Sequence, residues 1–154
     1  MLSYNLLSLR MKVFLIIITQ LICFIILTAC QNEKPVKEIV EKFPDGKVKK
    51  EVFYLKQQDK KEPVKEIEYY SNGKIKLEGT YKNGKMHGKW KVYYENGMVW
   101  SEGEYVDGLR EGYSKVYYPS GKLQFEGEYK KGQRTGTWKF YTPDGKVQKI
   151  VSFQ

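Results

Sequence analysis

The chain of 154 residues has only two cysteines and one histidine, and this scarcity limits the chemistry that it can support. Catalytic and zinc sites generally need several His, Cys or carboxylate side chains that converge on one point. The histidine, His87, falls in a glycine-flanked turn, and the repeats described below have Glu111 and Thr135 at its position. Paired acids such as Glu102 and Glu104 share one side of a strand beside lysines, which is typical of a solvated ladder. We therefore predict no catalytic residue, no metal site and no cofactor, and a protein that is not an enzyme.

The low cysteine content also limits disulfides. Cys23 lies in an apolar stretch, residues 11–29, which contains no acidic residue and follows Arg10. A positively charged start followed by an apolar run is typical of a secretion signal, and its removal takes Cys23 away. The exported chain then retains Cys30 alone, so we expect no disulfide framework.

The apolar run ends in Leu27-Thr28-Ala29-Cys30, which resembles the lipobox of bacterial lipoproteins. In that family the cysteine thiol receives a diacylglyceryl group and becomes the mature N-terminus. The resemblance implies that residues 1–29 are a lipoprotein signal peptide, that Cys30 is lipidated, and that residues 30–37 are the tether. An uncleaved transmembrane anchor is the alternative, because the apolar run is nearly long enough to span a bilayer. Either Met1 or Met11 can be the translation start.

Basic residues outnumber acidic ones, 27 against 18, and the formal net charge is +9. Without Arg10 and Lys12, which precede Cys30, 25 basic and 18 acidic residues remain, a formal charge of +7. A basic surface suits anionic lipid headgroups, acidic polymers or nucleic acid. Because an exported, anchored protein rarely meets nucleic acid, we expect no such partner. Gln31 stands where an aspartate retains some lipoproteins in the inner membrane, so outer-membrane attachment is favoured if the cell has two membranes.

The rest of the chain is rich in glycine and tyrosine and repeats itself. Blocks that begin at Tyr69, Tyr93, Tyr117 and Tyr141 start 24 residues apart, and the last is truncated. Four glycine columns recur in them: Gly73, Gly97, Gly121 and Gly145; Gly79, Gly103 and Gly127; Gly84, Gly108 and Gly132; Gly88, Gly112 and Gly136. A weaker copy begins at Phe43 and has an insertion near its end. We predict a degenerate first repeat over residues 38–63 and regular repeats over residues 64–154.

Each repeat has the pattern of a β-hairpin. Asn96-Gly97 separates two strand-like runs and predicts a two-residue turn with positive φ angles. Counting outward from this turn gives the pairs Tyr94–Val99, Tyr93–Trp100, Val92–Ser101, Lys91–Glu102, Trp90–Gly103 and Lys89–Glu104. The next unit gives Tyr118–Leu123, Val116–Phe125 and Lys115–Glu126. One face then collects aromatic and aliphatic side chains and the other collects Lys-Glu pairs. We expect the indole ring of Trp90 to cover Gly103.

This pattern resembles the MORN repeat in its bacterial variant, whose unit is NGK-x-x-x-EG-x-Y-x-NGK-x-x-GKW. The matching residues are Asn72-Gly73-Lys74, Glu78-Gly79, Tyr81, Asn83-Gly84-Lys85 and Gly88-Lys89-Trp90. The third unit departs by having Ser114 in place of tryptophan, and the last has Val151 in place of glycine. The resemblance implies an all-β fold, an elongated and twisted single-sheet meander of β-hairpin repeats, and a module for protein contact or scaffolding. Many exported members are labelled antitoxin-like by similarity.

One column of the repeat is tyrosine in every unit, at Tyr69, Tyr93, Tyr117 and Tyr141. By alternation it lies on the face opposite Trp90, where lysines stand two positions earlier, at Lys91, Lys115 and Lys139. Such an aromatic and basic stripe is able to hold a peptide, glycan or lipid headgroup. The alternative is that the tyrosines only support the sheet through cross-strand contacts. We predict that this stripe is a binding surface for an envelope protein, while the lipid on Cys30 holds the chain in the membrane.

Two other functions fit parts of the sequence. Aromatic-rich hairpins such as KWKVYYENG also resemble choline-binding modules, which suits a binder of envelope glycans or choline. An aromatic cage needs rings that converge on one point, whereas the rings here line up in columns and the Gly-Trp unit start of that family is missing. An antitoxin-like intracellular binder is the third possibility, and it requires that residues 1–29 are not a signal.

Overall fold

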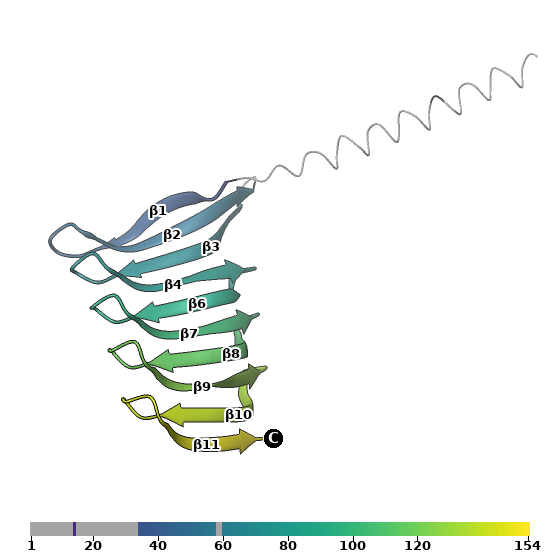
Figure 1. Cartoon of the computed structure of the whole chain (residues 1–154). Coiled ribbons are helices and arrows are strands. Elements are labelled where there is room, and N and C mark those ends of the chain that lie inside the picture. Colours follow the sequence, from purple (N-terminus) through teal and green to yellow (C-terminus); the bar gives the residue numbers. More distant parts are fainter. Residues whose placement is uncertain (1–13, 15–33, 58–59) are drawn as a thin grey trace, which may run out of the picture. The chain divides into compact units, whose positions relative to one another are not determined.

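The computed structural model describes Phe14, residues 34–57 and residues 60–154. The chain divides into two units, Met1–Glu33 and Lys34–Gln154, and the second is all β (Figure 1). The predicted lipidation site, Cys30, lies outside the described residues, as does the predicted signal peptide apart from Phe14. Within the described part of the chain, no helix is long and apolar enough to cross a membrane.

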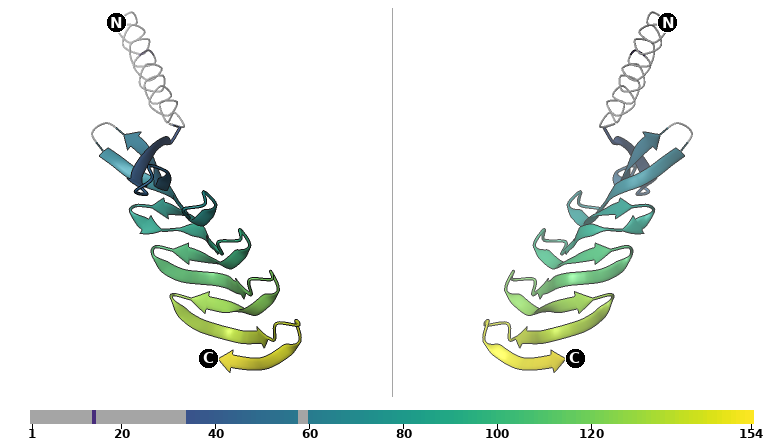
Figure 2. Two further views of the ribbon diagram at one scale, coloured as in Figure 1. Left: turned by 90° about the vertical axis from the view of Figure 1, so that its left-hand side faces the viewer. Right: turned by 90° about the vertical axis from the view of Figure 1, so that its right-hand side faces the viewer.

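The described residues of the second unit form one open antiparallel sheet of eleven strands (Figure 2). Each strand pairs with the next along the chain, with one exception. The short β5 pairs only with the end of β4, and β6 pairs with β4 beside it. The strands are β1 (Val36–Lys42), β2 (Val48–Gln57), β3 (Lys60–Tyr69), β4 (Ile75–Lys82), β5 (Lys85–Met86), β6 (Gly88–Tyr93), β7 (Val99–Val106), β8 (Leu109–Tyr117), β9 (Leu123–Lys130), β10 (Gln133–Tyr141) and β11 (Val147–Phe153). This arrangement confirms the predicted single-sheet meander of hairpins.

The sheet buries few apolar side chains because nothing in the described residues packs over it as a second layer. Its buried hydrophobic residues are Val52, Ile67, Trp90 and Trp138. Each hairpin contacts only its neighbours in the sheet, so stability is a sum of units and of the interfaces between them, as in other repeat proteins.

Five turns along one edge of the sheet share the same pair of backbone hydrogen bonds, at residues 43–47, 70–74, 94–98, 118–122 and 142–146. In the central turn the Gly97 amide donates to the Tyr94 carbonyl over 2.8 Å, and the Tyr94 amide donates to the Met98 carbonyl over 2.8 Å. Gly97 has a φ of 93°, whereas Asn96 is not among the residues with positive φ. The loop therefore has three residues, Glu95 to Gly97, and the predicted two-residue turn is wrong here. The Asn96 side chain closes the longer loop, because its Oδ1 accepts from the Met98 amide at 2.9 Å.

The longer loop changes the register only beside the turn. Tyr93 pairs with Val99 instead of Trp100, and the register then shifts by one residue. This shift is a β-bulge in which Trp100 has no partner on β6. Beyond the bulge the predicted pairs are found, namely Val92–Ser101, Lys91–Glu102, Trp90–Gly103 and Lys89–Glu104. The next unit behaves in the same way: Tyr117, not Tyr118, pairs with Leu123, and the pairs Val116–Phe125 and Lys115–Glu126 are confirmed.

Two-residue turns do occur, but at the opposite ends of the strands. Both residues have positive φ in Asn83-Gly84, Asp107-Gly108 and Lys131-Gly132. Asn and Asp tolerate this left-handed conformation better than other non-glycine residues. Lys131 adopts it with a φ of 49°, and its amide donates to Glu111 Oε2 over 2.7 Å. That hydrogen bond ties one turn to the preceding hairpin.

Candidate functional site

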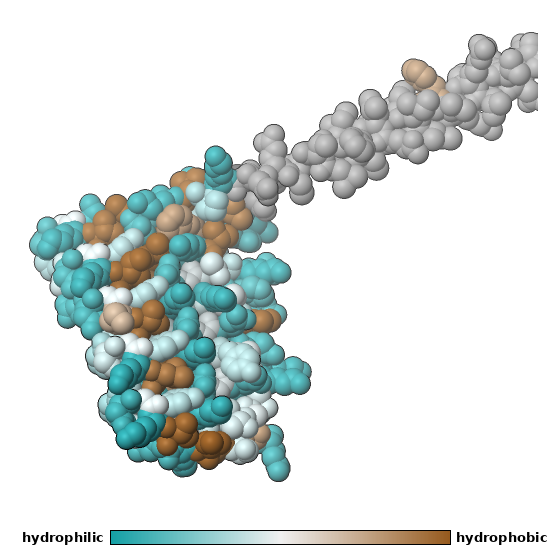
Figure 3. Space-filling view, in the orientation of Figure 1, coloured by the Kyte–Doolittle hydropathy of each residue, from teal (hydrophilic) through white to brown (hydrophobic). Residues whose placement is uncertain are grey.

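The two faces of the sheet differ in chemistry. The tryptophan face carries Trp90, Val92, Phe125, Trp138 and Phe140. The opposite face is the one seen in Figure 3, where a band of apolar side chains also crosses successive strands. The charged face carries a row of alternating charges, which in strand order from β4 to β10 is Glu78, Lys91, Glu102, Lys115, Glu126 and Lys139. The predicted segregation of side chains is thus confirmed away from the turns. Beside the turns it is wrong, because the aliphatic Val99 and Leu123 pair with Tyr93 and Tyr117 and so lie on the charged face.

Tryptophan rings on the tryptophan face cover glycines of the preceding strand. A Cβ atom on Gly79 would lie 2.0 Å from the ring of Trp90, and one on Gly127 would lie 2.2 Å from the ring of Trp138. The expected cover of Gly103 by Trp90 is wrong, although the two residues are paired in register. The ring turns toward β4 because its Nε1 donates to the Thr80 carbonyl over 3.0 Å.

Two aromatic rings flank each of these tryptophans. Trp90 lies between Tyr81 and Tyr105, with ring centroids 5.2 and 6.2 Å away. Trp138 lies between Tyr129 and Phe153, with centroids 5.1 and 6.2 Å away. All four contacts are edge-to-face, an arrangement that stabilises aromatic pairs beyond the area they bury.

The third unit lacks this tryptophan, and an arginine occupies the corresponding space. Ser114 is 3% exposed and pairs with Gly103, whose added Cβ would meet the serine Oγ at 3.4 Å. The Arg110 guanidinium lies 5.6 Å from the ring of Tyr105 and 5.2 Å from that of Tyr129. Its Nη1 donates to the Ser114 hydroxyl over 3.4 Å. A cation thus stands between two tyrosine rings, where the neighbouring units hold an indole.

On the charged face, the predicted tyrosine column is tied to a column of glutamates. Each tyrosine hydroxyl donates to a carboxylate on the preceding strand of the sheet: Tyr69 to Glu51 (3.0 Å), Tyr93 to Glu78 (2.7 Å), Tyr117 to Glu102 (2.7 Å) and Tyr141 to Glu126 (2.8 Å). The sequence argument placed these tyrosines beside lysines but missed the glutamates. The recurring Glu-Gly dipeptide was the available signal for three of them.

These contacts change the ionisation of the tyrosines. Burial raises the pKa of Tyr69, Tyr93 and Tyr117 to about 12, and hydrogen bonding to an anionic carboxylate adds to the effect. The pKa of Tyr141 is also raised, chiefly by its hydrogen bond to Glu126. A carboxylate acceptor favours the neutral phenol, which can donate, over the phenolate, which cannot. The column therefore contributes neutral rings, and the charge of this face comes from its lysines and glutamates.

The second tyrosine of each Tyr-Tyr pair connects adjacent repeats. The hydroxyls of Tyr70, Tyr94 and Tyr118 donate to the carbonyls of the tyrosine-column residues one unit further on, over 2.7, 2.8 and 2.8 Å. Turn asparagines do the same, since Asn96 Nδ2 donates to the Pro119 carbonyl over 3.1 Å. Side chains therefore fix the spacing of the units and with it the spacing of the columns on the charged face.

The three lysines of the predicted stripe lie on the same face as the tyrosine column. Lys91 Nζ is 3.9 Å from a Glu102 oxygen, while neither Lys115 nor Lys139 has an ion pair within the described part of the chain. The structure thus brings the stripe residues together on one surface, where carboxylates interrupt the lysines.

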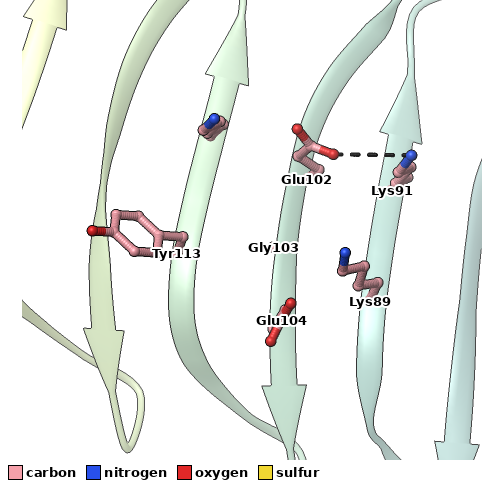
Figure 4. A pocket seen from close by; sticks show the side chains of 7 residues that line it. Lys89, Lys91, Glu102, Gly103, Glu104 and Tyr113 are labelled. Carbon is pink, nitrogen blue, oxygen red and sulfur yellow. Dashed lines mark ion pairs between the residues drawn. The ribbon is translucent and has the colours of Figure 1, made fainter.

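A hollow of about 160 Å³ opens on this face beside Tyr113 (Figure 4). Its walls are side chains of β6, β7 and β8: Lys89, Lys91, Glu102, Glu104, Tyr113 and Lys115. A second hollow of about 380 Å³ shares Tyr113 and extends to Thr137 and Lys139 on β10. Tyr113 is 65% exposed, and sequence reasoning missed it. The available signal was the exchange of Lys89-Trp90 for Tyr113-Ser114 at the same repeat position.

His87 was predicted in a turn but lies between β5 and β6, where its amide donates to the Thr80 carbonyl over 2.9 Å and its Nδ1 is 4.0 Å from Asp107 Oδ1. Residues 34–57 and 60–154 contain no group of three or more His, Cys, Asp or Glu side chains placed to hold a metal ion. The chemistry of this surface is therefore that of rings, amines and carboxylates.

An open sheet of stacked hairpins, tied together by side-chain hydrogen bonds from unit to unit, defines a β-repeat protein with an extended surface. The chain belongs to the MORN repeat variant family, whose model matches residues 64–83, 86–107, 110–131 and 134–154. The family consists generally of non-catalytic repeat and binding modules. The match confirms the family predicted from the glycine columns.

Curated protein sequences give no match to this chain. Among solved structures it is similar to one described as "Glycosylation Associate Protein (Gap123) complex from Streptococcus agalactiae", with 14% sequence identity and a TM-score of 0.41. The similarity covers 75% of this chain and 20% of that one, so the chain spans about a fifth of its length. A likeness this distant says nothing of what the chain binds.

Proposed function

We propose that this protein is a lipid-anchored, extracytoplasmic repeat protein that binds another protein through the charged face of its sheet and performs no catalysis. The observation that carries the proposal is the tyrosine column, in which four hydroxyls bonded to glutamates hold the side chains of this face at fixed intervals. An ordered, solvent-facing array binds with little loss of side-chain entropy.

The charged face suits binding better than the tryptophan face does. Trp90 and Trp138 are buried over glycines, and their indole nitrogens are already bonded to backbone carbonyls. On the charged face, Lys115 and Lys139 have no ion pair within the described residues, so their amines can pair with carboxylates of a partner. Complementary charge of this kind speeds association and selects the partner.

The anchor rests on the sequence Leu27-Thr28-Ala29-Cys30. A diacylglyceryl group supplies two acyl chains, and stable membrane attachment needs about two such signals because one chain binds only marginally. An anchored binder works at the membrane surface, where its partner is another component of the envelope.

The test is crosslinking and pull-down from intact cells. We compare the wild-type protein with a stripe variant, Lys91→Gln/Lys115→Gln/Lys139→Gln, and with a control that loses the same charge in the edge turns and on the tryptophan face, Lys122→Gln/Lys146→Gln/Lys149→Gln. We expect the stripe variant to lose its specific protein partner while the control keeps it, with both variants folded by circular dichroism. A stripe variant that still recovers the partner at the wild-type level contradicts the proposal.

A further inference from the structure

One unit of the repeat carries its aromatic residue one position earlier than the others. The equivalent dipeptides are Lys89-Trp90, Tyr113-Ser114 and Thr137-Trp138. Successive side chains of a strand point to opposite faces, so this shift moves the ring from the tryptophan face to the charged face. The structure bears this out, because Tyr113 is 65% exposed and lines the hollow of the charged face, while Ser114 is 3% exposed on the other face.

The shift is unfavourable for packing. In the neighbouring units a buried ring covers Gly79 or Gly127, whereas Gly103 meets only the small side chain of Ser114. An aromatic ring left in solvent contributes little to folding, while a buried one contributes its whole apolar area. A position that departs from the local rule at a cost in stability is typical of a functional site.

The surroundings of Tyr113 define what the site can bind. Tyr113 lines both hollows, and Figure 4 shows its ring extending from β8 toward β9, away from the carboxylates of Glu102 and Glu104 on β7 and from Lys89 on β6. Neither Lys89 nor Lys115 has an ion pair within the described ranges of the chain. The site thus offers one exposed ring and two amines able to accept new carboxylate partners.

We propose that Tyr113, Lys89 and Lys115 form a peptide-binding site for an acidic, extended segment of a partner protein. The ring packs against an apolar side chain of the segment, and the two lysines pair with its carboxylates. Tyrosines are enriched among the residues that dominate protein interfaces. Glu102 and Glu104 also line the hollow and repel a uniformly anionic polymer, whereas a peptide can alternate acidic and neutral residues. The inference rests on the proposed protein-binding function and names the part of the charged face that performs it.

The probe is a random linear peptide library displayed on phage and selected on the folded repeat protein. We expect enrichment of sequences rich in Asp and Glu, and the synthetic peptides should bind Tyr113→Thr about tenfold or more weakly than wild type. Thr is the residue at the equivalent position 137, so this variant should fold normally. Lys89→Thr/Lys115→Gln should lose binding in the same way, and the control Lys146→Gln/Lys149→Gln should keep it.

Three results would overturn this inference. Selected peptides that are neutral or basic contradict the chemistry of the site. Acidic peptides that bind Tyr113→Thr as tightly as wild type place their site elsewhere and leave the proposed protein-binding function intact. An absence of selected peptides, together with Tyr113-dependent binding of a uronic-acid oligosaccharide, shows that the site takes a glycan.

Discussion

At the scale of single residues, the contacts between tryptophan and glycine hold the repeats together. The Trp138 side chain is fully buried, which is unusual in a sheet with two open faces, and it owes this to the absence of a side chain on Gly127 and to the rings around it. Gly103 stands in the same glycine column but faces Ser114. One column thus contains both a tightly packed glycine and a loosely packed one.

This difference predicts unequal effects of the same substitution. Gly127→Ala should destabilise the protein by roughly 1–3 kcal/mol, because its Cβ overlaps the Trp138 ring at 2.2 Å and the ring must move. Gly103→Ala should cost less than about 1 kcal/mol, since its Cβ would come no closer than 3.4 Å to any neighbour, and that neighbour is the Ser114 hydroxyl. Urea unfolding of both variants measures the difference. Equal losses of stability would contradict the packing described for the tryptophan face.

The third unit should gain stability if its tryptophan is restored. Ser114→Trp should raise the free energy of unfolding by about 0.5–2 kcal/mol, because the ring would cover Gly103 between Tyr105 and Tyr129. Arg110 can move onto the new ring, as Arg134 already stacks 4.5 Å from the ring of Trp138. Thermal unfolding tests this, with Ser114→Ala as the control that removes the hydroxyl and adds no ring. A lower melting temperature for Ser114→Trp would show that Arg110 cannot be displaced.

At the scale of the strands, the burial of the tyrosine column and its hydrogen bonds to glutamates couple folding to high pH. The pKa of Tyr93 and Tyr117 is raised from 10.0 to about 12, so between these values the unfolded chain loses protons that the folded protein keeps. The folded state then binds more protons, and stability falls as pH rises through this window. Below pH 10 the tyrosines contribute no pH dependence.

We expect the double variant Tyr93→Phe/Tyr117→Phe to show a smaller loss of stability between pH 10 and pH 12 than the wild-type protein. The substitution keeps both rings and removes the two groups that ionise. Urea unfolding at several pH values gives the slope for each protein. An unchanged slope would mean that these tyrosines ionise equally in the folded and unfolded states.

At the scale of the whole molecule, the prediction concerns attachment to the membrane. Cys30→Ser should abolish lipid labelling, because a hydroxyl does not replace the thiol that forms the thioether. Metabolic labelling with a fatty-acid analogue, followed by detergent partition, provides the measurement. Cys23→Ser is the matched control, since Cys23 precedes the predicted cleavage site and its loss should leave labelling unchanged. Label retained by Cys30→Ser would contradict the predicted anchor.

The sequence by itself determined the family, the repeat length and the division of side chains between two faces. These features are local, because a glycine needed for positive φ marks each turn and side-chain alternation then assigns each strand residue to a face. The register of Lys91 with Glu102 and of Val116 with Phe125 followed from the same counting. Only the pairs beside the turns were wrong. The third loop residue shifts the register by one position, and the bulge at Trp100 shifts it back for the rest of the strand.

Only the tertiary structure decided which neighbour each side chain contacts. A strand within a sheet has two neighbours, and hairpin counting considers one of them. Trp90 therefore seemed placed to cover its hairpin partner Gly103, but its ring lies over Gly79 on the other side. For the same reason the Glu78 acceptor of Tyr93, on a strand outside its hairpin, was missed. The exposure of Tyr113 depends on the strands at both of its sides, and local sequence patterns do not contain that information.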